Sequence, residues 1–166
     1  ANIMNANLDL THVKNVPCAH NLLKRMLAND PSYRPSAEQV SKHPFFWSDL
    51  QRLDFLTTFS DRLEHEALTS MIVQTLEADA TSIVGKNWDR KLHSALLEDM
   101  GKYRKYDTGS VRDCLRVIRN KRHHFAELSE EIKMILSPMP DAFLFMIGTH
   151  LDNINQIEND IVSSLS

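Results

Sequence analysis

Hydrophobic residues recur along this chain three or four positions apart, and most segments that carry them begin with a residue that favours the start of a helix. The first segment covers 17–28, where four apolar residues share one side and Pro17 occupies a first-turn position that helices tolerate. Ser36 and Gln39 have the spacing of a capping box, in which two side chains satisfy backbone donors at the start of a helix. The pattern therefore predicts two helices in the first quarter of the chain.

A longer helix is predicted to begin at Ser48, because Ser48 and Gln51 form a second capping box. We expect this helix to end near residue 59, with Ser60 capping a further helical segment that runs to about residue 78. The apolar residues that we expect to face the core from these two segments are Leu50, Leu53, Phe55, Leu56, Leu63, Leu68, Ile72, Val73 and Leu76.

The segment Gly109–Phe125 has the clearest helical pattern of the chain. Ser110 can accept a hydrogen bond from the backbone N–H of Asp113, whose carboxylate lies in the first turn, where the helix dipole favours it. The apolar stripe of this helix consists of Val111, Cys114, Leu115 and Ile118. The other faces carry arginine, asparagine and histidine, so one helix combines a core-facing stripe with most of the candidate chemistry.

The remaining segments have less regular patterns. We expect a loop-bearing segment at 79–92, in which Trp88 packs into the core more readily than it stacks on a nucleobase. A helix is predicted from His93 to about residue 103, and a short helix begins at Ser129. The final helices are predicted over 141–161, with an apolar stripe that suits a core.

These patterns predict an all-α fold. The chain has only four glycines and few alternating β-branched residues, which argues against a sheet. Its 166 residues, 42% of them hydrophobic, are enough to bury a core. The two cysteines, Cys18 and Cys114, lack metal-ligand spacing and indicate a reducing, cytoplasmic compartment. The longest apolar run, 142–148, is too short to cross a bilayer, so we expect no membrane contact by this chain.

Charge is distributed unevenly along the sequence. Residues 86–124 contain 11 of the 19 lysines and arginines against five acids, whereas residues 125–166 contain one lysine against seven acids. A basic centre beside an acidic tail indicates a local anionic partner rather than a protein that coats nucleic acid everywhere. The alternative is that the basic residues pair with the acidic tail within the fold.

The helix with the clearest pattern also gathers arginine and histidine. At about 100° per residue, Asn120 and His124 lie one turn apart on one face, and the neighbouring flank carries Arg112, Arg116, Arg119 and His123. Cleavage of RNA needs such groups, because cationic donors hold a phosphate and an imidazole moves a proton. The alternative is a solvated basic helix. We expect no metal site, because adjacent histidines on a helix point about 100° apart.

Basic and aromatic residues alternate just before this helix, in Lys102–Tyr106. Such interleaving can hold phosphate through Arg104 and Lys105 and can stack bases on tyrosine rings. Tyr103 has the alternative of packing into the core.

The run KYRKYDTGSVRDCLRVIRNKRHHF, residues 102–125, resembles the signature of the kinase-extension nuclease domain, found in the inositol-requiring kinase/endoribonuclease and in ribonuclease L. The stretch LLKRMLANDPSYRPSAEQVSKHPFF, residues 22–46, is similar to the end of a protein-kinase catalytic domain. We therefore predict a kinase-lobe remnant at 1–47 and a helical endoribonuclease domain at 48–166. The sequence has no glycine-rich loop, H-R-D or D-F-G motif, so it provides no kinase site for ATP and Mg²⁺.

The resemblance implies a metal-independent endoribonuclease that needs no cofactor and cuts RNA, stem-loops in particular, to a 2′,3′-cyclic phosphate and a free 5′-OH. It makes His124 the general acid, and Tyr106 the base or the group that positions the 2′-OH. Arg119 and Asn120 would hold the scissile phosphate. A phenol stays protonated at neutral pH, so Tyr106 needs nearby cations to act as a base. The further residues that we expect to contact RNA are Arg104, Lys105, Arg116, Lys121 and His123, of which His123 has an equally good alternative as a structural hydrogen-bond donor.

The resemblance also implies a homodimer formed through the nuclease domain, on the cytosolic face of the endoplasmic reticulum membrane. There the family senses unfolded protein, and its cleavage serves messenger RNA splicing or RNA decay. The main alternative is a non-catalytic module that binds RNA or dimerises without cutting RNA, since the same basic residues would serve it.

Overall fold

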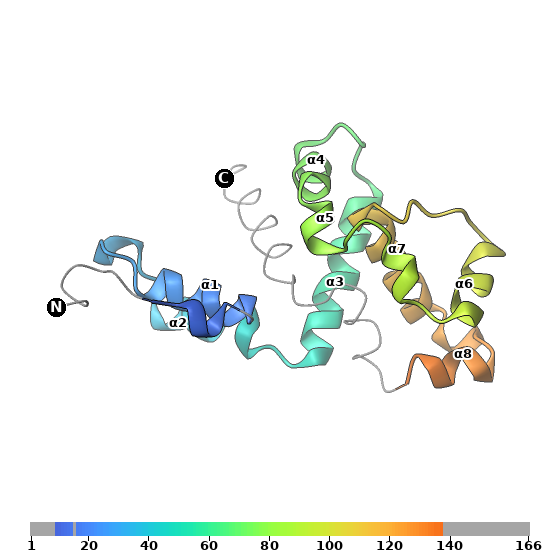
Figure 1. Cartoon of the computed structure of the whole chain (residues 1–166), viewed down its shortest axis with the longest axis horizontal. Coiled ribbons are helices and arrows are strands. Elements are labelled where there is room, and N and C mark those ends of the chain that lie inside the picture. The colour runs from blue at the N-terminus through green and yellow to red at the C-terminus, as the bar shows by residue number, and fades with distance from the viewer. Residues whose placement is uncertain (1–8, 15, 138–166) are drawn as a thin grey trace.

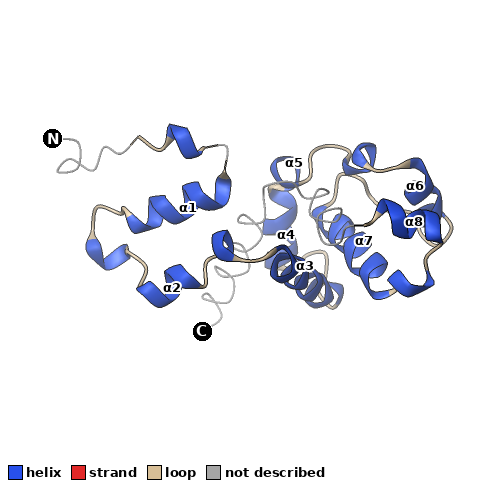
Figure 2. Cartoon of the chain, turned by 90° about the horizontal axis from the view of Figure 1, so that it is seen from below, coloured by secondary structure: helices blue, strands red, loops and turns tan. Residues whose placement is uncertain are grey.

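The computed structural model of the chain describes residues 9–14 and 16–137. Figure 2 shows helices joined by loops, and the described part of the chain contains no strand. The predicted all-α fold is therefore confirmed. The α-helices are α1 (Pro17–Met26), α2 (Ala37–Ser41), α3 (Asp49–Glu64), α4 (Met71–Ala78), α5 (Ala80–Ile83), α6 (Ser94–Gly101), α7 (Val111–His123) and α8 (Glu130–Ile135). The 3₁₀ helices are η1 (Thr11–Val13), η2 (Pro31–Tyr33), η3 (Pro44–Phe46), η4 (Trp88–Lys91) and η5 (Phe125–Glu127).

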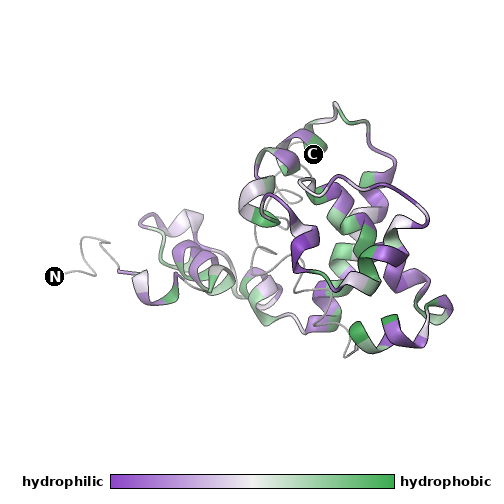
Figure 3. Cartoon of the chain, turned by 45° about the vertical axis from the view of Figure 1, so that its right-hand side comes forward, coloured by the Kyte–Doolittle hydropathy of each residue, from purple (hydrophilic) through white to green (hydrophobic). Residues whose placement is uncertain are grey.

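Helices α3 and α7 form the centre of the fold. They pack against each other, α4 also packs against α7, and α6 packs against α8 (Figure 1). The helices carry both hydrophobic and hydrophilic residues (Figure 3), and buried hydrophobic residues of α3–α8 meet in a single core. The whole predicted stripe of α7 is buried, with Val111, Cys114, Leu115 and Ile118 fully inaccessible to solvent. The pattern of the sequence therefore identified the helix around which the core is built.

Helix starts follow the predicted chemistry. The capping boxes of α2 and α3 are both formed. The hydroxyls of Ser36 and Ser48 each accept from the backbone N–H of the glutamine three residues on, and the backbone N–H of each serine donates to the side-chain oxygen of that glutamine. Ser129 caps α8 by accepting from the backbone N–H of Ile132. Local sequence therefore fixes these three helix starts independently of the packing around them.

The end of α3 differs from the prediction. Ser60 caps no helix: it lies inside α3, which continues to Glu64, and its small side chain is buried against the core. Two leucines predicted to face the core are exposed instead. Leu50 stands in the first turn of α3, before the helix enters the bundle, and Leu68 lies in the turn that joins α3 to α4. Helical spacing predicts a face but does not predict which turns of a helix are covered by neighbours.

The segment 79–92 contains α5 and η4, and a loop joins them. The prediction for Trp88 is confirmed: the ring is fully buried, and its indole N–H donates to the backbone oxygen of Ser110 at 3.1 Å. Tyr103 does not pack into the core, because α6 ends at Gly101 and the tyrosine that follows is 80% exposed.

At the other end of the chain, α1 and α2 lie together, apart from the bundle of α3–α8 (Figure 1). Helix α1 contacts η3, and Trp47 then packs against Phe55 of α3 with ring centroids 5.2 Å apart. The division into 1–47 and 48–166 stays a prediction. The predicted helices over 141–161 lie outside the described residues.

Candidate active site

Helix α7 positions most of the candidate site residues, and its N-terminus is held by a residue of α4. The Glu77 carboxylate accepts hydrogen bonds from the Ser110 hydroxyl at 2.7 Å and from the backbone N–H groups of Val111 and Arg112 at 3.1 and 2.9 Å. Ser110 also accepts from the backbone N–H of Asp113, as predicted. A carboxylate at this end of a helix satisfies otherwise unpaired donors and complements the helix dipole. These bonds fix where α7 begins relative to the core.

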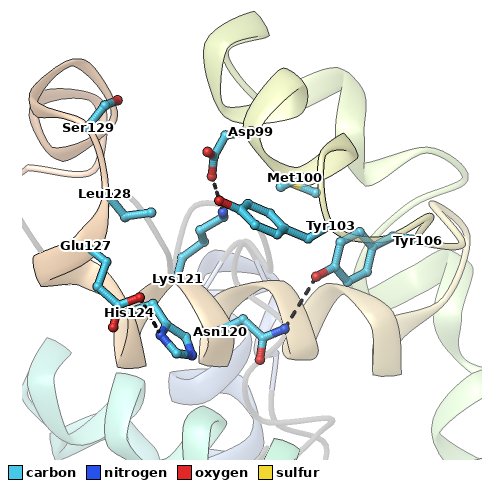
Figure 4. Close-up of a pocket in the computed structure, with 10 residues that line it drawn as sticks. All are labelled: Asp99, Met100, Tyr103, Tyr106, Asn120, Lys121, His124, Glu127, Leu128 and Ser129. Atoms are coloured by element: carbon cyan, nitrogen blue, oxygen red, sulfur yellow. Dashed lines mark hydrogen bonds and ion pairs between the residues drawn. The ribbon is translucent and has the colours of Figure 1, made fainter.

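The same helix start fixes the loop that carries Tyr106. The backbone N–H of Asp107 donates to the carboxylate of Asp113 at 2.8 Å, which ties the loop to the first turn of α7. The Tyr106 ring also packs edge-on against the buried Trp88, with centroids 6.5 Å apart. Its hydroxyl oxygen accepts a hydrogen bond from the Asn120 amide at 3.4 Å (Figure 4). Tyr106 and Asn120 therefore meet across 14 residues of sequence.

Arg119 extends this network. Its Nε and Nη2 both donate to the side-chain oxygen of Asn120, at 3.2 and 3.1 Å. On the other side its Nη1 faces two carboxylates of α3, Glu64 at 3.3 Å and Asp61 at 3.5 Å. The guanidinium is thus held between α3 and Asn120, and the amide links the arginine to the phenol of Tyr106.

His124 follows the last residue of α7 and has an exposed imidazole. Its Nδ1 lies 3.1 Å from the Glu127 carboxylate, so this carboxylate favours a tautomer with the proton on Nδ1. An exposed imidazole can exchange protons with a ligand and with solvent. The neighbouring His123 is exposed as well, but it does not line the same cavity.

A cavity of about 380 Å³ brings these groups together. Figure 4 shows its ten lining residues, which come from α6, the segment 102–110, α7 and the segment after α7. Four of them were predicted as site residues: Tyr106, Asn120, Lys121 and His124. Arg119 does not line the cavity and reaches it through its bonds to Asn120. The arrangement places a phenol, an amide, an ammonium and an imidazole around one space large enough for part of a nucleotide.

The other predicted RNA contacts lie in different surroundings. Lys121 is buried, and its ammonium pairs with Asp99 of α6. Arg104 lies over the Tyr106 ring, 5.9 Å from its centroid. Lys105 is exposed in the same segment.

Arg116 was predicted to contact RNA, but its side chain forms ion pairs within the fold. It is buried and pairs with Glu64 at 2.8 Å and with Asp113 at 2.9 Å. Together with Arg104 it lines a second hollow, of about 600 Å³, rather than the cavity at His124. The carboxylate of Glu64 is itself affected: burial opposes its ionisation, but the Arg116 hydrogen bond and the charges of the surrounding arginines hold its pKa below the usual value.

Three of the four arginines of α7 therefore have acidic partners within the described residues, and the fourth, Arg112, donates to the backbone oxygens of Leu63 and Glu66. Arg116 and Arg119 pair with Glu64 of α3, and Arg122 pairs with Asp54, which also lies in α3. Four of the seven acids of 125–166 lie outside the described residues, so the alternative in which the acidic tail pairs with the basic residues stays a prediction. Sequence alone could not show the ion pairs between α7 and α3, because the paired residues are more than 50 positions apart.

Several residues of the site escaped prediction. Glu127 follows His124 by three residues, and this helical spacing was a usable signal. Asp99, Glu64 and Glu77 gave no signal, because each contacts the site helix only through the tertiary fold.

In the described part of the chain, no group of three or more His, Cys, Asp and Glu side chains is arranged to hold a metal ion. None of the helices among those residues is both long and apolar enough to cross a membrane.

Comparison with known proteins identifies the family. The ribonuclease 2-5A family matches residues 52–147. A rice protein named serine/threonine-protein kinase/endoribonuclease IRE1 is 45% identical over 142 residues, which are 86% of this chain and 16% of the relative.

Two further relatives agree. The Schizosaccharomyces pombe sensor for unfolded proteins in the ER, ire1, is 43% identical over 148 residues, 86% of this chain and 14% of the relative. Human serine/threonine-protein kinase/endoribonuclease IRE2 is 40% identical over 148 residues, 87% of this chain and 16% of the relative. The chain thus spans 14–16% of the length of these three relatives. The resemblance to the kinase-extension nuclease domain is confirmed, and the chain belongs to the ribonuclease 2-5A family shared with the IRE1 proteins.

Proposed function

We propose that this chain is an endoribonuclease and acts as the RNA-cleaving part of an IRE1-type sensor of unfolded proteins. The observation that carries this proposal is the convergence of Tyr106, Asn120 and His124 on one cavity, with Arg119 bound to the same asparagine. The family membership and the names of the relatives support it. The substrate class is RNA with an accessible loop.

The proposed reaction is an in-line transesterification. The ribose 2′-oxygen forms a bond to the adjacent phosphorus, the bond from phosphorus to the 5′-oxygen breaks, and the products carry a 2′,3′-cyclic phosphate and a 5′-OH. His124 gives its proton to the departing 5′-oxygen. Tyr106, whose ring centroid lies 5.9 Å from the Arg104 guanidinium, either accepts the proton of the 2′-OH or orients this hydroxyl while solvent takes the proton.

Arg119 and Asn120 stabilise the charge that grows on the phosphate during this step. Their mutual hydrogen bonds set the guanidinium and the amide before RNA arrives, and preorganised donors are worth more than donors that must reorient. Each proton transfer and each charge contact in the scheme is assigned to a side chain of this protein or to solvent. We therefore propose that cleavage needs no metal ion or other cofactor.

Assembly and location form part of the same proposal. A single nuclease domain offers a small RNA surface, so we propose that two copies act together and that activity per protomer rises with protein concentration. We place the reaction on the cytosolic side of the endoplasmic reticulum, where an IRE1-type sensor would meet messenger RNA.

The proposal is tested by cleavage of a labelled stem-loop RNA in excess EDTA, with the products analysed for a cyclic phosphate end. Replacing His124 with Ala should lower the rate by about 10²–10⁴-fold, the usual contribution of a general acid, while RNA binding and helicity persist. His12→Ala, in the exposed helix η1 far along the chain, is the matched control and should cleave normally. Loss of cleavage in EDTA, or wild-type cleavage by His124→Ala, would refute the mechanism. RNA that is shifted on a gel but never cut would indicate a binding module.

A further inference from the structure

The cavity at the site has a second half that the proposed chemistry does not use. Beyond Tyr106 and His124 it is lined by Tyr103 and by the apolar side chains of Met100 and Leu128. In Figure 4, Tyr103 and Leu128 extend toward the same space from opposite sides, with Lys121 between them. This half, bounded by Met100, Tyr103 and Leu128, is called the Tyr103 subsite.

Tyr103 is unusual among the aromatic residues around the core, because its side chain is 80% exposed although it stands beside an apolar wall. The ring is nevertheless held in place. The ammonium of Lys121 lies 5.8 Å from its centroid, and Lys121 is in turn buried and fixed by its ion pair with Asp99. A cation over an aromatic ring stabilises the position of the ring at little cost in exposed area. Most of the ring surface therefore remains available to a planar ligand.

The position of the subsite limits what that ligand can be. It is continuous with the space between Tyr106, Asn120 and His124, where the scissile phosphate of the proposed reaction would lie. A group bound against Tyr103 must then be covalently close to that phosphate, and in RNA the planar group next to a phosphate is a nucleobase. Proteins that read RNA without opening a helix splay unpaired bases onto exposed aromatic rings.

We propose that the Tyr103 subsite binds one unpaired nucleobase of the RNA, adjacent to the scissile phosphate, and stacks it on the Tyr103 ring. The inference rests on the proposed function in taking RNA as the ligand. Apolar contact with Met100 and Leu128 encloses the edge of the base, while the Asp99–Lys121 pair offers an acceptor and a donor at the wall of the same cavity. The subsite thereby selects RNA in which the base at this position is free to leave its stack.

The experiment uses the full chain and a stem-loop RNA with a 2′-deoxy substitution at the cleavage position, which removes the nucleophile and leaves binding to be measured. 2-Aminopurine at single loop positions reports stacking through quenching of its fluorescence. Tyr103→Phe and Tyr103→Trp should keep the quenching at one position. Tyr103→Leu should abolish it and weaken binding by roughly 5- to 150-fold, the range expected for one base stacked on an aromatic ring.

Tyr33→Leu is the matched control, because Tyr33 is also a highly exposed tyrosine, 77% accessible, but lies in η2 away from the bundle. An abasic nucleotide at the quenched position provides the second test: it should weaken binding to the wild-type chain and leave binding to Tyr103→Leu unchanged. On cleavable RNA, Tyr103→Leu should raise KM more than it lowers kcat, whereas a general loss of fold would lower kcat and thermal stability together.

The outcomes separate the two proposals. Two results would overturn the subsite and leave the nuclease proposal standing. One is cleavage with equal KM for wild type and Tyr103→Leu, and the other is an abasic nucleotide that weakens binding to Tyr103→Leu as much as it weakens binding to the wild-type chain. Quenching that depends on Tyr103, with no cleavage of any RNA, would support the subsite and overturn the nuclease proposal. A chain that binds no RNA at any concentration would overturn both.

Discussion

The contact between Glu77 and the start of α7 gives the sharpest test of how this fold supports its site. One carboxylate from α4 accepts three hydrogen bonds, two from backbone N–H groups of α7 and one from the Ser110 hydroxyl. We predict that replacing Glu77 with Ala destabilises the protein strongly, although Glu77 does not line the cavity of the proposed chemistry. The reason is that α7 would begin with unpaired donors in a half-buried position.

The expected size follows from these contacts. A hydrogen bond to a charged group contributes about 1.5–3 kcal/mol, but three bonds to one carboxylate share its desolvation and do not add. Water can reach part of the vacated space, so we expect a loss of about 3 kcal/mol in the free energy of unfolding for Glu77→Ala. Glu77→Gln keeps one acceptor oxygen and loses the charge at the helix end, which should cost about 1–2 kcal/mol. For a protein of this size, 3 kcal/mol corresponds to a fall in Tm of roughly 6–12 °C.

Urea and thermal unfolding followed by circular dichroism would measure these losses. Glu98→Ala is the matched control, because Glu98 is an exposed glutamate of the neighbouring α6 and should change stability by less than about 0.5 kcal/mol. If Glu77→Ala were as stable as this control, the carboxylate would be replaceable by water, and the argument that it fixes the start of α7 would fail.

Two further predictions concern buried groups. Burial raises the pKa of the Cys114 thiol to about 12, so iodoacetamide at pH 8 should leave Cys114 unmodified in the folded protein and label it after unfolding, as read by mass spectrometry. The pKa of Glu64 is lower in the folded than in the unfolded chain, so its contribution to stability is present above an unfolded pKa of about 4.3 and is lost as the pH falls through the folded value. The stability difference between wild type and Glu64→Gln should therefore shrink between pH 5 and pH 3 in urea titrations, and a constant difference would contradict this assignment.

Local chemistry explains why much of the fold could be predicted from sequence. The capping boxes at Ser36 and Ser48 and the buried stripe of α7 depend on residues within one or two turns of each other. The prediction that Ser60 caps a helix was wrong, because a serine is also tolerated inside a helix when its small side chain fits against the core, as it does in α3. The prediction that Leu68 faces the core was wrong, because its spacing fits a continuous helix, whereas a turn separates α3 from α4 at this position.

The site was predictable to a smaller extent, for a physical reason. Tyr106, Asn120 and His124 could be named from one continuous run, and the cavity brings them together. Their supporting carboxylates could not be named, because Asp99, Glu64 and Glu77 come from other helices and carry no local signature. Orientation within a site depends on tertiary neighbours, and a single sequence contains no direct record of them.

Arg119 illustrates how the packing of the core and the proposed chemistry are connected. Its guanidinium spans the junction of α3 and α7, with Glu64 on one side and Asn120 on the other. A carboxylate beside a phosphate-binding arginine reduces the net positive charge that RNA meets, so attraction at long range is weakened. The same carboxylate holds the planar guanidinium in one orientation, so its remaining N–H donors are already oriented when the phosphate binds. Because α3 and α7 share the largest part of the core, any shift between them moves Arg119 relative to Tyr106 and His124. The geometry of the proposed site is therefore a property of the α3–α7 packing, and not of the α7 sequence alone.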